Sequence, residues 1–209
     1  MRICEIFYSL QGEGMLMGLP TVFVRTVGCN LDCSWCDTPY ARDGGKEMLV
    51  EDIAKKVEAF GVDTVCITGG EPLIQDETYQ LIDALLDKGF YIQLETNGSI
   101  SLERLPCYQE LLISMDVKTP SSGMNGNTVM KNLEMLSPFD QLKFVVAGKE
   151  DMDFVEDILS SHEIKCPVIV TAVGGVKLLE VSEWVLSKRL QVRVMPQLQK
   201  IIWGEQRGV

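Results

Sequence analysis

Histidine and positive charge are both scarce in this chain. His162 is the only histidine among 209 residues, and 19 lysine and arginine residues face 30 aspartate and glutamate residues, giving a net charge of −11. Such an acidic chain offers no broad surface for a phosphate backbone, so we expect no nucleic-acid partner. His162 also lies far in sequence from the cysteine-rich segment described below, so it is not placed to complete a closed zinc site there.

Long apolar runs and an export signal are also lacking, and the number of cysteines is odd. No run approaches the roughly 20 apolar residues of a membrane span, and residues 1–5 do not resemble a signal peptide. Seven cysteines without an export signal indicate a reducing cytoplasm and no disulfide framework. We therefore expect a cytoplasmic protein with no membrane partner, in which Cys4, Cys66, Cys107 and Cys166 are packing residues.

No repeat, low-complexity tract or interdomain linker interrupts the sequence. With 46% hydrophobic and 23% charged residues, the composition is that of a globular chain with a sizeable core. The length of 209 residues fits one domain, so we predict a single domain spanning residues 1–209.

Strand-like and helix-like segments alternate along the chain. Apolar, β-branched runs predict strands at 3–8, 21–27, 63–68, 91–95, 111–117, 141–147, 167–173 and 191–195. Helical spacing of apolar residues predicts helices at 49–60, 75–88, 128–136, 150–160 and 177–188. This alternation is typical of a parallel sheet with right-handed crossovers. Because a closed eightfold barrel takes about 250 residues, we predict an α/β fold: a partial TIM-type barrel of about six parallel strands with helices outside.

The segment 28–38 carries three cysteines within eight residues, Cys29, Cys33 and Cys36, spaced C-x3-C-x2-C. It begins at the carboxyl end of the predicted strand 21–27, where parallel α/β folds place their sites. Thiolates bind zinc or iron–sulfur clusters. Structural zinc takes four ligands, whereas three cysteines on a four-iron cluster leave one iron open for chemistry. Three core cysteines clustered by chance are the alternative, but a core has no reason to adopt this spacing.

Other polar or glycine-containing segments lie at predicted strand ends. Thr68-Gly69-Gly70-Glu71-Pro72 combines a backbone that approaches a ligand closely with a carboxylate that can accept from an ammonium group. The loop 11–14 has two glycines around a glutamate, and 95–98 ends in Asn-Gly; either segment alone could be a simple turn. Arg25 lies inside an apolar strand, where a guanidinium needs an anionic or polar partner.

The cysteine spacing, with Trp35 just before the third cysteine, resembles the signature of radical S-adenosylmethionine (SAM) enzymes, and Gly69-Gly70-Glu71-Pro72 resembles their SAM-binding motif. A finer resemblance, over nearly the whole chain, is to the 7-carboxy-7-deazaguanine synthases of queuosine and 7-deazapurine biosynthesis. The segments that carry it are 7–14, 23–25, 28–38, 69–72, 95–98, 116–123 and 196–197. The chain has no second cysteine cluster for an auxiliary iron–sulfur centre, which agrees with this family.

The resemblance implies a lyase reaction and three cofactors. A radical SAM enzyme of this family converts 6-carboxy-5,6,7,8-tetrahydropterin to 7-carboxy-7-deazaguanine, with ring contraction and loss of ammonia. The implied cofactors are a [4Fe-4S] cluster, SAM and Mg²⁺. The family also suggests a homodimer and an electron donor such as flavodoxin.

The resemblance also assigns roles by position. It implies that Cys29, Cys33 and Cys36 bind the cluster and that Thr38 binds Mg²⁺; Thr38 could equally be a turn or N-cap residue before Pro39. The residues implied to bind SAM are Trp35, Cys36, Asp37, Gly70, Glu71, Asp116, Val117 and Lys118. The residues implied to bind the pterin are Leu10, Gln11, Gly12, Arg25 (which meets its carboxylate) and Thr68.

Two segments depart from the family pattern. Gln199 stands where members commonly have histidine, and an amide supplies no imidazolium proton. The segment 171–174 also differs from the expected form and receives no role. Two alternatives stay open: a radical SAM activase that puts a glycyl radical on a partner protein, and a non-catalytic iron–sulfur or zinc protein. Three ligands plus the Gly-Gly-Glu-Pro motif argue against the second, because electron-transfer clusters normally have four protein ligands.

Overall fold

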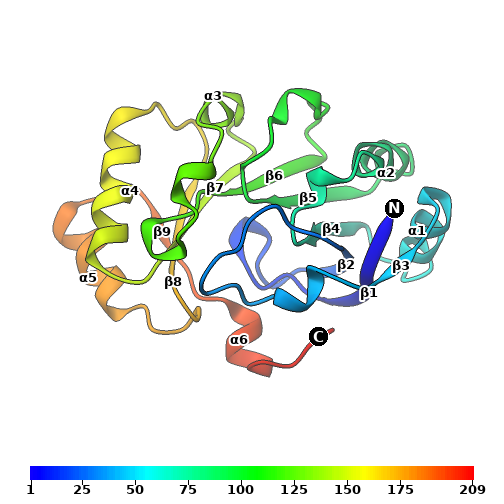
Figure 1. The fold of residues 1–209 in the computed structure, drawn as a ribbon, viewed down its shortest axis with the longest axis horizontal. Coiled ribbons are helices and arrows are strands. Elements are labelled where there is room, and N and C mark those ends of the chain that lie inside the picture. The colour runs from blue at the N-terminus through cyan, green and yellow to red at the C-terminus, as the bar shows by residue number, and fades with distance from the viewer.

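One sheet of nine strands runs through the molecule in the order β3-β1-β2-β4-β5-β6-β7-β8-β9 (Figure 1). The structure is a computed structural model that describes residues 1–209. The strands are β1 (Arg2–Leu10), β2 (Pro20–Thr26), β3 (Lys46–Glu47), β4 (Thr64–Gly69), β5 (Tyr91–Thr96), β6 (Leu111–Asp116), β7 (Gln141–Val146), β8 (Val168–Ala172) and β9 (Arg193–Val194). Because β3 and β9 form the two edges and do not pair, the barrel is incomplete, as predicted.

Parallel pairing extends over β2, β4, β5, β6, β7, β8 and β9, which is one strand more than the predicted six. The first strand is the exception, because β1 pairs antiparallel with both β2 and β3. The loop 11–19 between β1 and β2 is too short for the crossover that a parallel neighbour requires. The prediction of parallel strands throughout was therefore wrong for β1.

Helices pack outside the sheet, with α1 and α2 toward one end and α4 and α5 toward the other (Figure 1). Their bounds are α1 (Val50–Glu58), α2 (Glu77–Leu86), α3 (Asn132–Met135), α4 (Lys149–Ser161), α5 (Leu179–Lys188) and α6 (Leu198–Trp203). The predicted helix 128–136 is reduced to α3, because Val129 donates its N–H to Gly98 O (2.9 Å) outside any helix. Helix α6 was not predicted, since its short apolar run shows no extended periodicity.

Alternation along the strands separates an apolar layer from a polar interior. Val65 and Ile67 on β4 join one hydrophobic core with helix residues such as Ile53 of α1 and Leu85 of α2. The strand residues between these apolar positions face the other side of the sheet. Several of them are buried and polar: Gln93, Ser114, Gln141, Lys143 and Thr171. A polar interior of this kind has to be satisfied by internal hydrogen bonds or by ligands.

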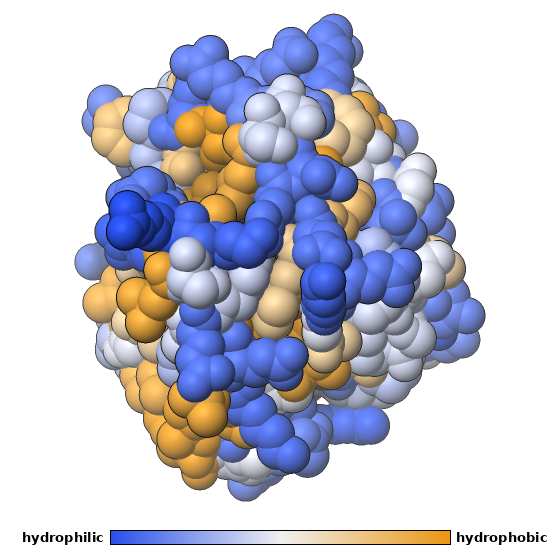
Figure 2. All heavy atoms as spheres, turned by 90° about the vertical axis from the view of Figure 1, so that its left-hand side faces the viewer, coloured by the Kyte–Doolittle hydropathy of each residue, from blue (hydrophilic) through white to orange (hydrophobic).

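Charged and apolar side chains are mixed on the surface at the α4–α5 end (Figure 2). Leu179 and Leu186 of α5 are exposed there, but blue hydrophilic groups separate the orange patches. No helix of the protein has both the length and the apolar character needed to cross a lipid bilayer.

Candidate active site

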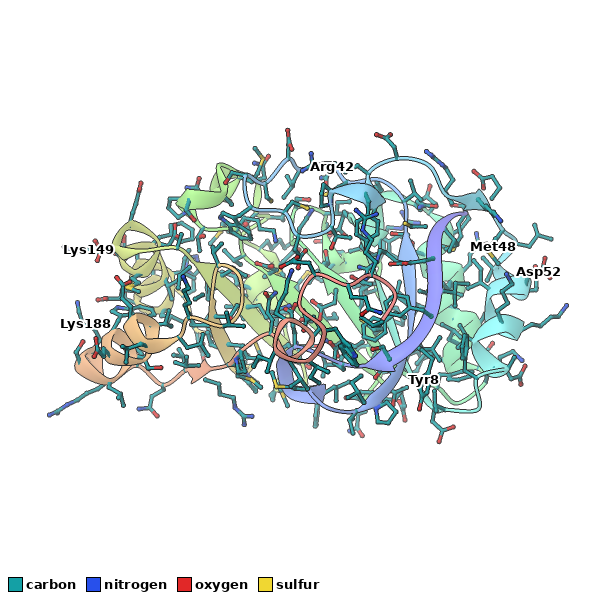
Figure 3. All side chains as sticks on the ribbon, turned by 90° about the horizontal axis from the view of Figure 1, so that it is seen from below. Tyr8, Arg42, Met48, Asp52, Lys149 and Lys188 are labelled. Atoms are coloured by element: carbon teal, nitrogen blue, oxygen red, sulfur yellow. The ribbon has the colours of Figure 1, made fainter.

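One cavity of about 720 Å³ lies at the carboxyl ends of the parallel strands. Helix α6 and the residues after it lie across the middle of the sheet when the molecule is viewed from below (Figure 3), and residues 204–209 form part of the cavity wall. Most of the predicted site residues line this cavity: Leu10, Gln11, Gly12, Arg25, Cys29, Cys33, Trp35, Cys36, Asp37, Thr38, Thr68, Gly70, Asp116 and Lys118. Two predicted residues, Glu71 and Val117, do not line it.

The cysteine segment is fixed at its start by the Gly-Gly turn after β4. Gly28 has a φ of +97°, a conformation that favours glycine, and its carbonyl accepts from Glu71 N at 2.8 Å. A Cβ atom on Gly70 would lie 2.0 Å from Gly28 O, so only glycine allows this approach. Further along, Trp35 Nε1 donates to Ser121 Oγ at 3.1 Å, which joins the segment to the loop after β6.

The three thiols of this segment lie in the wall of one cavity, although no three cysteine, histidine or acidic side chains of the structure are grouped closely enough to hold a metal ion. Cys29, Cys33 and Cys36 are free, partly exposed and part of the same cavity wall. Cys29 Sγ accepts from Leu31 N (3.5 Å) and Asn97 Nδ2 (3.8 Å), the kind of N–H donation that supports a thiolate. Cys66 also borders the cavity, but burial raises the pKa of its thiol far above the ordinary value, so it stays protonated.

Glu71 holds two motifs together instead of offering a free carboxylate. It is fully buried, and its oxygens accept from Leu73 N (3.0 Å), Thr96 Oγ1 (2.9 Å) and Asn97 N (2.7 Å). These bonds connect the Gly-Gly-Glu-Pro turn to the Glu-Thr-Asn-Gly turn. Val117 is likewise buried in the hydrophobic core, so neither of these two side chains, which the family resemblance implied to bind SAM, lines the cavity.

Asp116 and Lys118 form a half-buried ion pair beside the cysteine segment. Lys118 Nζ lies 2.8 Å from Asp116 Oδ2 and 5.5 Å from the centre of the Trp35 ring. Burial disfavours the charged ammonium, but Asp116 outweighs burial and raises the pKa of Lys118. The second oxygen of the carboxylate, Asp116 Oδ1, is buried without a partner, so this corner can accept a hydrogen bond from a ligand.

A second charged network lies beside this pair in the cavity wall, because Asp116 of β6 and Lys143 of β7 are register partners. Lys143 Nζ contacts Glu13 Oε2 (2.6 Å) and Glu95 Oε2 (3.1 Å). Glu13 Oε1 also accepts from the side-chain amides of Gln197 and Gln199, both at 2.9 Å. Burial alone would raise the pKa of Glu13, but Lys143 and the two amides lower it to about 2. Glu13 is therefore a fixed negative charge between the predicted substrate loop and α6.

Arg25 has the polar partner that its position in an apolar strand required. Its Nε donates to Glu5 Oε1 (2.7 Å), which also accepts from the Tyr40 hydroxyl (3.1 Å). The guanidinium carbon lies 5.6 Å from the Phe7 ring centre and 5.9 Å from that of Tyr40. No hydrogen bond is formed by the terminal nitrogens of Arg25, so they are free to meet an anion in the cavity.

Sequence reasoning missed the wall residues that are distant from the motifs. These are Tyr40, Lys143 and Arg207, whereas Glu13, Glu95 and Gln197 were quoted within motifs but given no role. Lys143 did carry a signal, since a lysine between apolar residues of a buried strand requires an acidic partner. Arg207 carried none, because its position over the Tyr40 ring depends on the path of the chain after α6.

Comparison with known proteins identifies the family. The model of the radical SAM superfamily matches residues 23–137. A 7-carboxy-7-deazaguanine synthase from Methanospirillum hungatei is 41% identical over 97% of this chain and 85% of its own length, and one from Thermoplasma acidophilum is 37% identical over the whole of both chains. The crystal structure of QueE from Escherichia coli superposes with a TM-score of 0.74 at 24% identity, covering 93% of each chain. The partial-barrel fold and the family resemblance are thereby confirmed: the chain belongs to the 7-carboxy-7-deazaguanine synthase family of the radical SAM superfamily.

Proposed function

We propose that the protein is a lyase that converts 6-carboxy-5,6,7,8-tetrahydropterin to 7-carboxy-7-deazaguanine, with ring contraction and loss of ammonia, in queuosine or 7-deazapurine biosynthesis. The relatives that match nearly the whole chain carry the name of this activity. One observation on the protein itself supports the proposal: a single cavity joins three free cysteine thiols to an arginine and a polar network. A cluster-bound cofactor and a carboxylated, hydrogen-bonding substrate therefore find complementary groups in one space.

The cysteine side of the cavity is proposed to hold the cofactors. Cys29, Cys33 and Cys36 would bind a [4Fe-4S] cluster, which together with SAM supplies hydrogen-atom abstraction from the substrate. Gly70 brings backbone close to the cysteine segment without a Cβ atom in the way. We assign SAM contacts to the residues around that space: Trp35, Cys36, Asp37, Gly70, Asp116 and Lys118.

The substrate is proposed to bind at the opposite side. The terminal nitrogens of Arg25 offer a bidentate match to a carboxylate. Gln11 is buried and its amide donates to Gln93 Oε1 (3.0 Å), while its Oε1 accepts from Glu13 N (3.1 Å). These bonds fix the loop of Leu10, Gln11 and Gly12, so it can hold a flat heterocycle without first being ordered. Thr68, at the end of β4, completes this wall.

Magnesium is proposed to bind at Thr38. The Thr38 hydroxyl donates to Asp37 Oδ1 at 2.9 Å, which leaves hydroxyl and carboxylate oxygens beside the last cysteine of the motif. Mg²⁺ prefers such oxygen ligands and usually takes few from the protein. An ion held there would lie between the cysteine segment and a substrate in the cavity.

The proposed cellular setting follows from the family. We place the protein in the cytoplasm, with reduction by an electron donor such as flavodoxin. The exposure of Ser34 in the cysteine segment supports the proposed electron donor, because a donor protein must approach the cluster through the surface.

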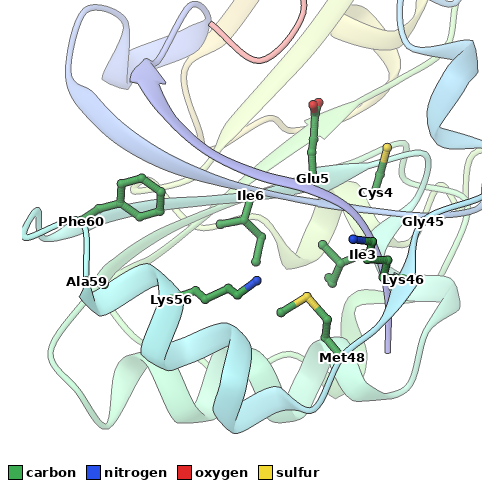
Figure 4. A pocket seen from close by; sticks show the side chains of 10 residues that line it. All are labelled: Ile3, Cys4, Glu5, Ile6, Gly45, Lys46, Met48, Lys56, Ala59 and Phe60. Atoms are coloured by element: carbon green, nitrogen blue, oxygen red, sulfur yellow. The ribbon is translucent and has the colours of Figure 1, made fainter.

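A homodimer is the proposed assembly. A second cavity, of about 700 Å³, lies between β1, β3 and α1 (Figure 4). Ile6 and Met48 point into it, whereas Glu5 points the other way, toward Arg25. Because β3 pairs only with Arg2 and Ile3, the outer edge of β1 beyond Ile3 has no neighbouring strand. An apolar groove beside an open strand edge is suited to the same surface of a second copy.

The test is anaerobic turnover of the reconstituted protein. Iron and sulfide are restored, and SAM, dithionite, Mg²⁺ and 6-carboxy-tetrahydropterin are added. Mass spectrometry is expected to detect 7-carboxy-7-deazaguanine and stoichiometric ammonia. If 5′-deoxyadenosine accumulated without that product, the radical SAM assignment would stand and the substrate assignment would fall.

A further inference from the structure

Loss of ammonia requires proton transfers that hydrogen-atom abstraction does not provide. When an amine is eliminated, a proton leaves carbon and the C–H electron pair forms the new double bond. The C–N electron pair leaves with nitrogen, which then gains a proton. The step is redox-neutral, and one proton is taken and one is given, so a single side chain can do both. This reasoning depends on the function proposed above, because that function includes the loss of ammonia.

Histidine, the side chain most often used for such transfers, is absent from the cavity wall. His162, the only histidine, follows α4 and its ring contacts Ile158 O. Position 199 carries an amide, and its Nε2 already donates to Glu13. The proton must therefore be carried by a different group.

Most titratable groups of the wall are fixed in one protonation state near neutral pH. Burial raises the pKa of the Tyr40 hydroxyl and of the Cys66 thiol, and Tyr40 also donates to Glu5. Burial disfavours the charged form of Lys143, but Glu13 and Glu95 raise its pKa well above the ordinary value, and the pKa of Glu13 is about 2. Asp116 pairs with Lys118, Asp37 accepts from the Thr38 hydroxyl, and Lys200 pairs with Glu205 on the segment after α6.

Glu95 keeps one carboxylate oxygen with an open lone-pair site. Its Oε2 accepts from Ser114 Oγ (3.0 Å) and Lys143 Nζ (3.1 Å), and its Oε1 accepts from Gln93 Nε2 (2.5 Å). A carboxylate has about four lone-pair sites, so Oε1 keeps one free site. The side chain is 18% exposed and forms part of the cavity wall. A proton can therefore reach and leave Oε1 from the cavity.

The titratable groups that face Glu95 come from three neighbouring segments. Lys143 on β7 contacts it directly, Glu13 lies on the far side of Lys143, and the neutral Cys66 thiol lies on β4. Burial is the largest influence and raises the pKa of Glu95; Lys143 opposes it and the Glu13 charge adds to it. The pKa values of the two carboxylates that share this ammonium are thus pushed apart. Glu13 stays ionised, whereas Glu95 exchanges its proton more readily.

We propose that Glu95 is the proton-transfer residue of the reaction: Oε1 takes a proton from a ring carbon of the bound substrate and gives it to the departing amine. Lys143 and Ser114 hold the carboxylate in place through Oε2, which leaves Oε1 for the transfer. Glu13 keeps Lys143 charged throughout.

The experiment compares Glu95→Gln and Glu95→Asp with the wild type, and Glu103→Gln, on an exposed surface ion pair, is the matched control. In Glu95→Gln we expect the rate of 7-carboxy-7-deazaguanine formation to fall by about 10²–10³-fold. Cleavage of SAM in the presence of substrate should continue, and calorimetric affinity for the pterin, measured without SAM, should change less than about threefold. The acid limb of the wild-type kcat profile should shift in Glu95→Asp and disappear in Glu95→Gln.

Three results would overturn the proposal. Product formation by Glu95→Gln within about threefold of wild type would show that another group moves the proton. A loss of pterin affinity or of thermal stability that accounts for the lost rate would make Glu95 a structural residue. If the wild type bound the pterin, cleaved SAM and released no ammonia, the proposed function would fail, and the inference with it; that result is distinct because it appears before any substitution is made.

Discussion

At the scale of single residues, Arg25 combines a structural contact with a free binding edge. Its Nε is held by Glu5, and its terminal nitrogens face the cavity. Arg25→Ala should raise the KM for the carboxylated pterin by about 10- to 100-fold, because a hydrogen bond to a charged group is worth about 1.5–3 kcal/mol. Iron content after reconstitution should stay normal.

The control for this prediction is Arg104→Ala, which removes an exposed guanidinium that stacks on Tyr79 and does not line the cavity. Steady-state kinetics with and without the substrate carboxylate gives the decisive comparison. If Arg25→Ala lost its fold while KM in the remaining active fraction stayed unchanged, Arg25 would be only the partner of Glu5.

Gly70 tests the contact between the two motifs. A Cβ atom there would lie 2.0 Å from Gly28 O and 2.7 Å from Cys29 Cβ, so Gly70→Ala must displace the start of the cysteine segment. We expect iron incorporation, measured by absorbance and metal analysis, to fall at least severalfold. Gly126→Ala is the matched control, because no atom lies within 4 Å of its added Cβ and its φ is not positive. Equal iron content in the two variants would contradict the role of the close approach.

At the scale of elements, Glu13 fastens α6 to the loop after β1. The helix makes a backbone contact as well, since Leu198 N donates to Gly12 O at 2.9 Å. The pKa of Glu13 is lowered from an ordinary value near 4.5 to about 2, which corresponds to about 3 kcal/mol of folding free energy. A carboxyl pKa depressed in the folded state gives stability that is fully present above the unfolded value and is lost as pH falls toward the folded one.

The expected outcome is a pH-dependent difference between wild type and Glu13→Gln. At pH 7 the variant should unfold with about 3 kcal/mol less free energy, and the difference should shrink steadily between about pH 5 and pH 2. Urea unfolding at several pH values measures it. A difference that stayed constant down to pH 3 would show that the Glu13 charge does not stabilise the contact between α6 and the loop after β1.

The segment after α6 adds a second guanidinium to the Arg25 side of the cavity. The Arg207 guanidinium carbon lies 3.9 Å from the centre of the Tyr40 ring, and that of Arg25 lies 5.9 Å from the same ring. Stacking leaves the edge nitrogens of Arg207 available to an anion. Arg207→Ala should therefore raise the KM of the pterin by about three- to tenfold at unchanged iron content, and Arg207→Lys should not restore it because an ammonium does not stack as a plane. An unchanged KM in steady-state assays would exclude this contribution.

At the scale of the whole molecule, the contiguous motifs could be predicted from the sequence. The hydrogen-bond and ion-pair network that joins distant segments in the cavity wall could not. The roles of the segments 28–38 and 68–72 could be predicted because the residues of each motif are contiguous in sequence and follow directly after a strand. Lys143 and Gln197 reach Glu13 across 130 and 184 residues, and no local pattern reports such a meeting. The strands were found because their apolar alternation is local, whereas the antiparallel direction of β1 depended on the length of the loop that follows it. The role of Glu71 could not be predicted in full. Its motif was recognised, but the three groups that donate hydrogen bonds to its carboxylate are identified only by the structure.

The arrangement of edges in the sheet leads to the prediction for assembly. At one end β9 is very short, but at the other the long strand β1 is covered by β3 only at Arg2 and Ile3. Two copies related by a twofold axis would present these β1 edges in opposite directions, which is the orientation that antiparallel pairing requires. The apolar rim of the groove includes the exposed rings of Tyr8 and Phe60, whose centres are 6.1 Å apart.

Phe60→Asp should therefore convert a dimer into a monomer, because it places a charge on the apolar rim of the groove without touching the core. Light scattering after size exclusion measures the mass, and the wild type should have twice the mass of one chain. Tyr108→Asp is the matched control, since Tyr108 is also an exposed ring but lies outside this groove. Because the cavity at the carboxyl ends of the strands is built within one chain, the Phe60→Asp monomer should still take up iron. A wild type that is monomeric, or a Phe60→Asp variant that stays dimeric, would place the interface on a different surface.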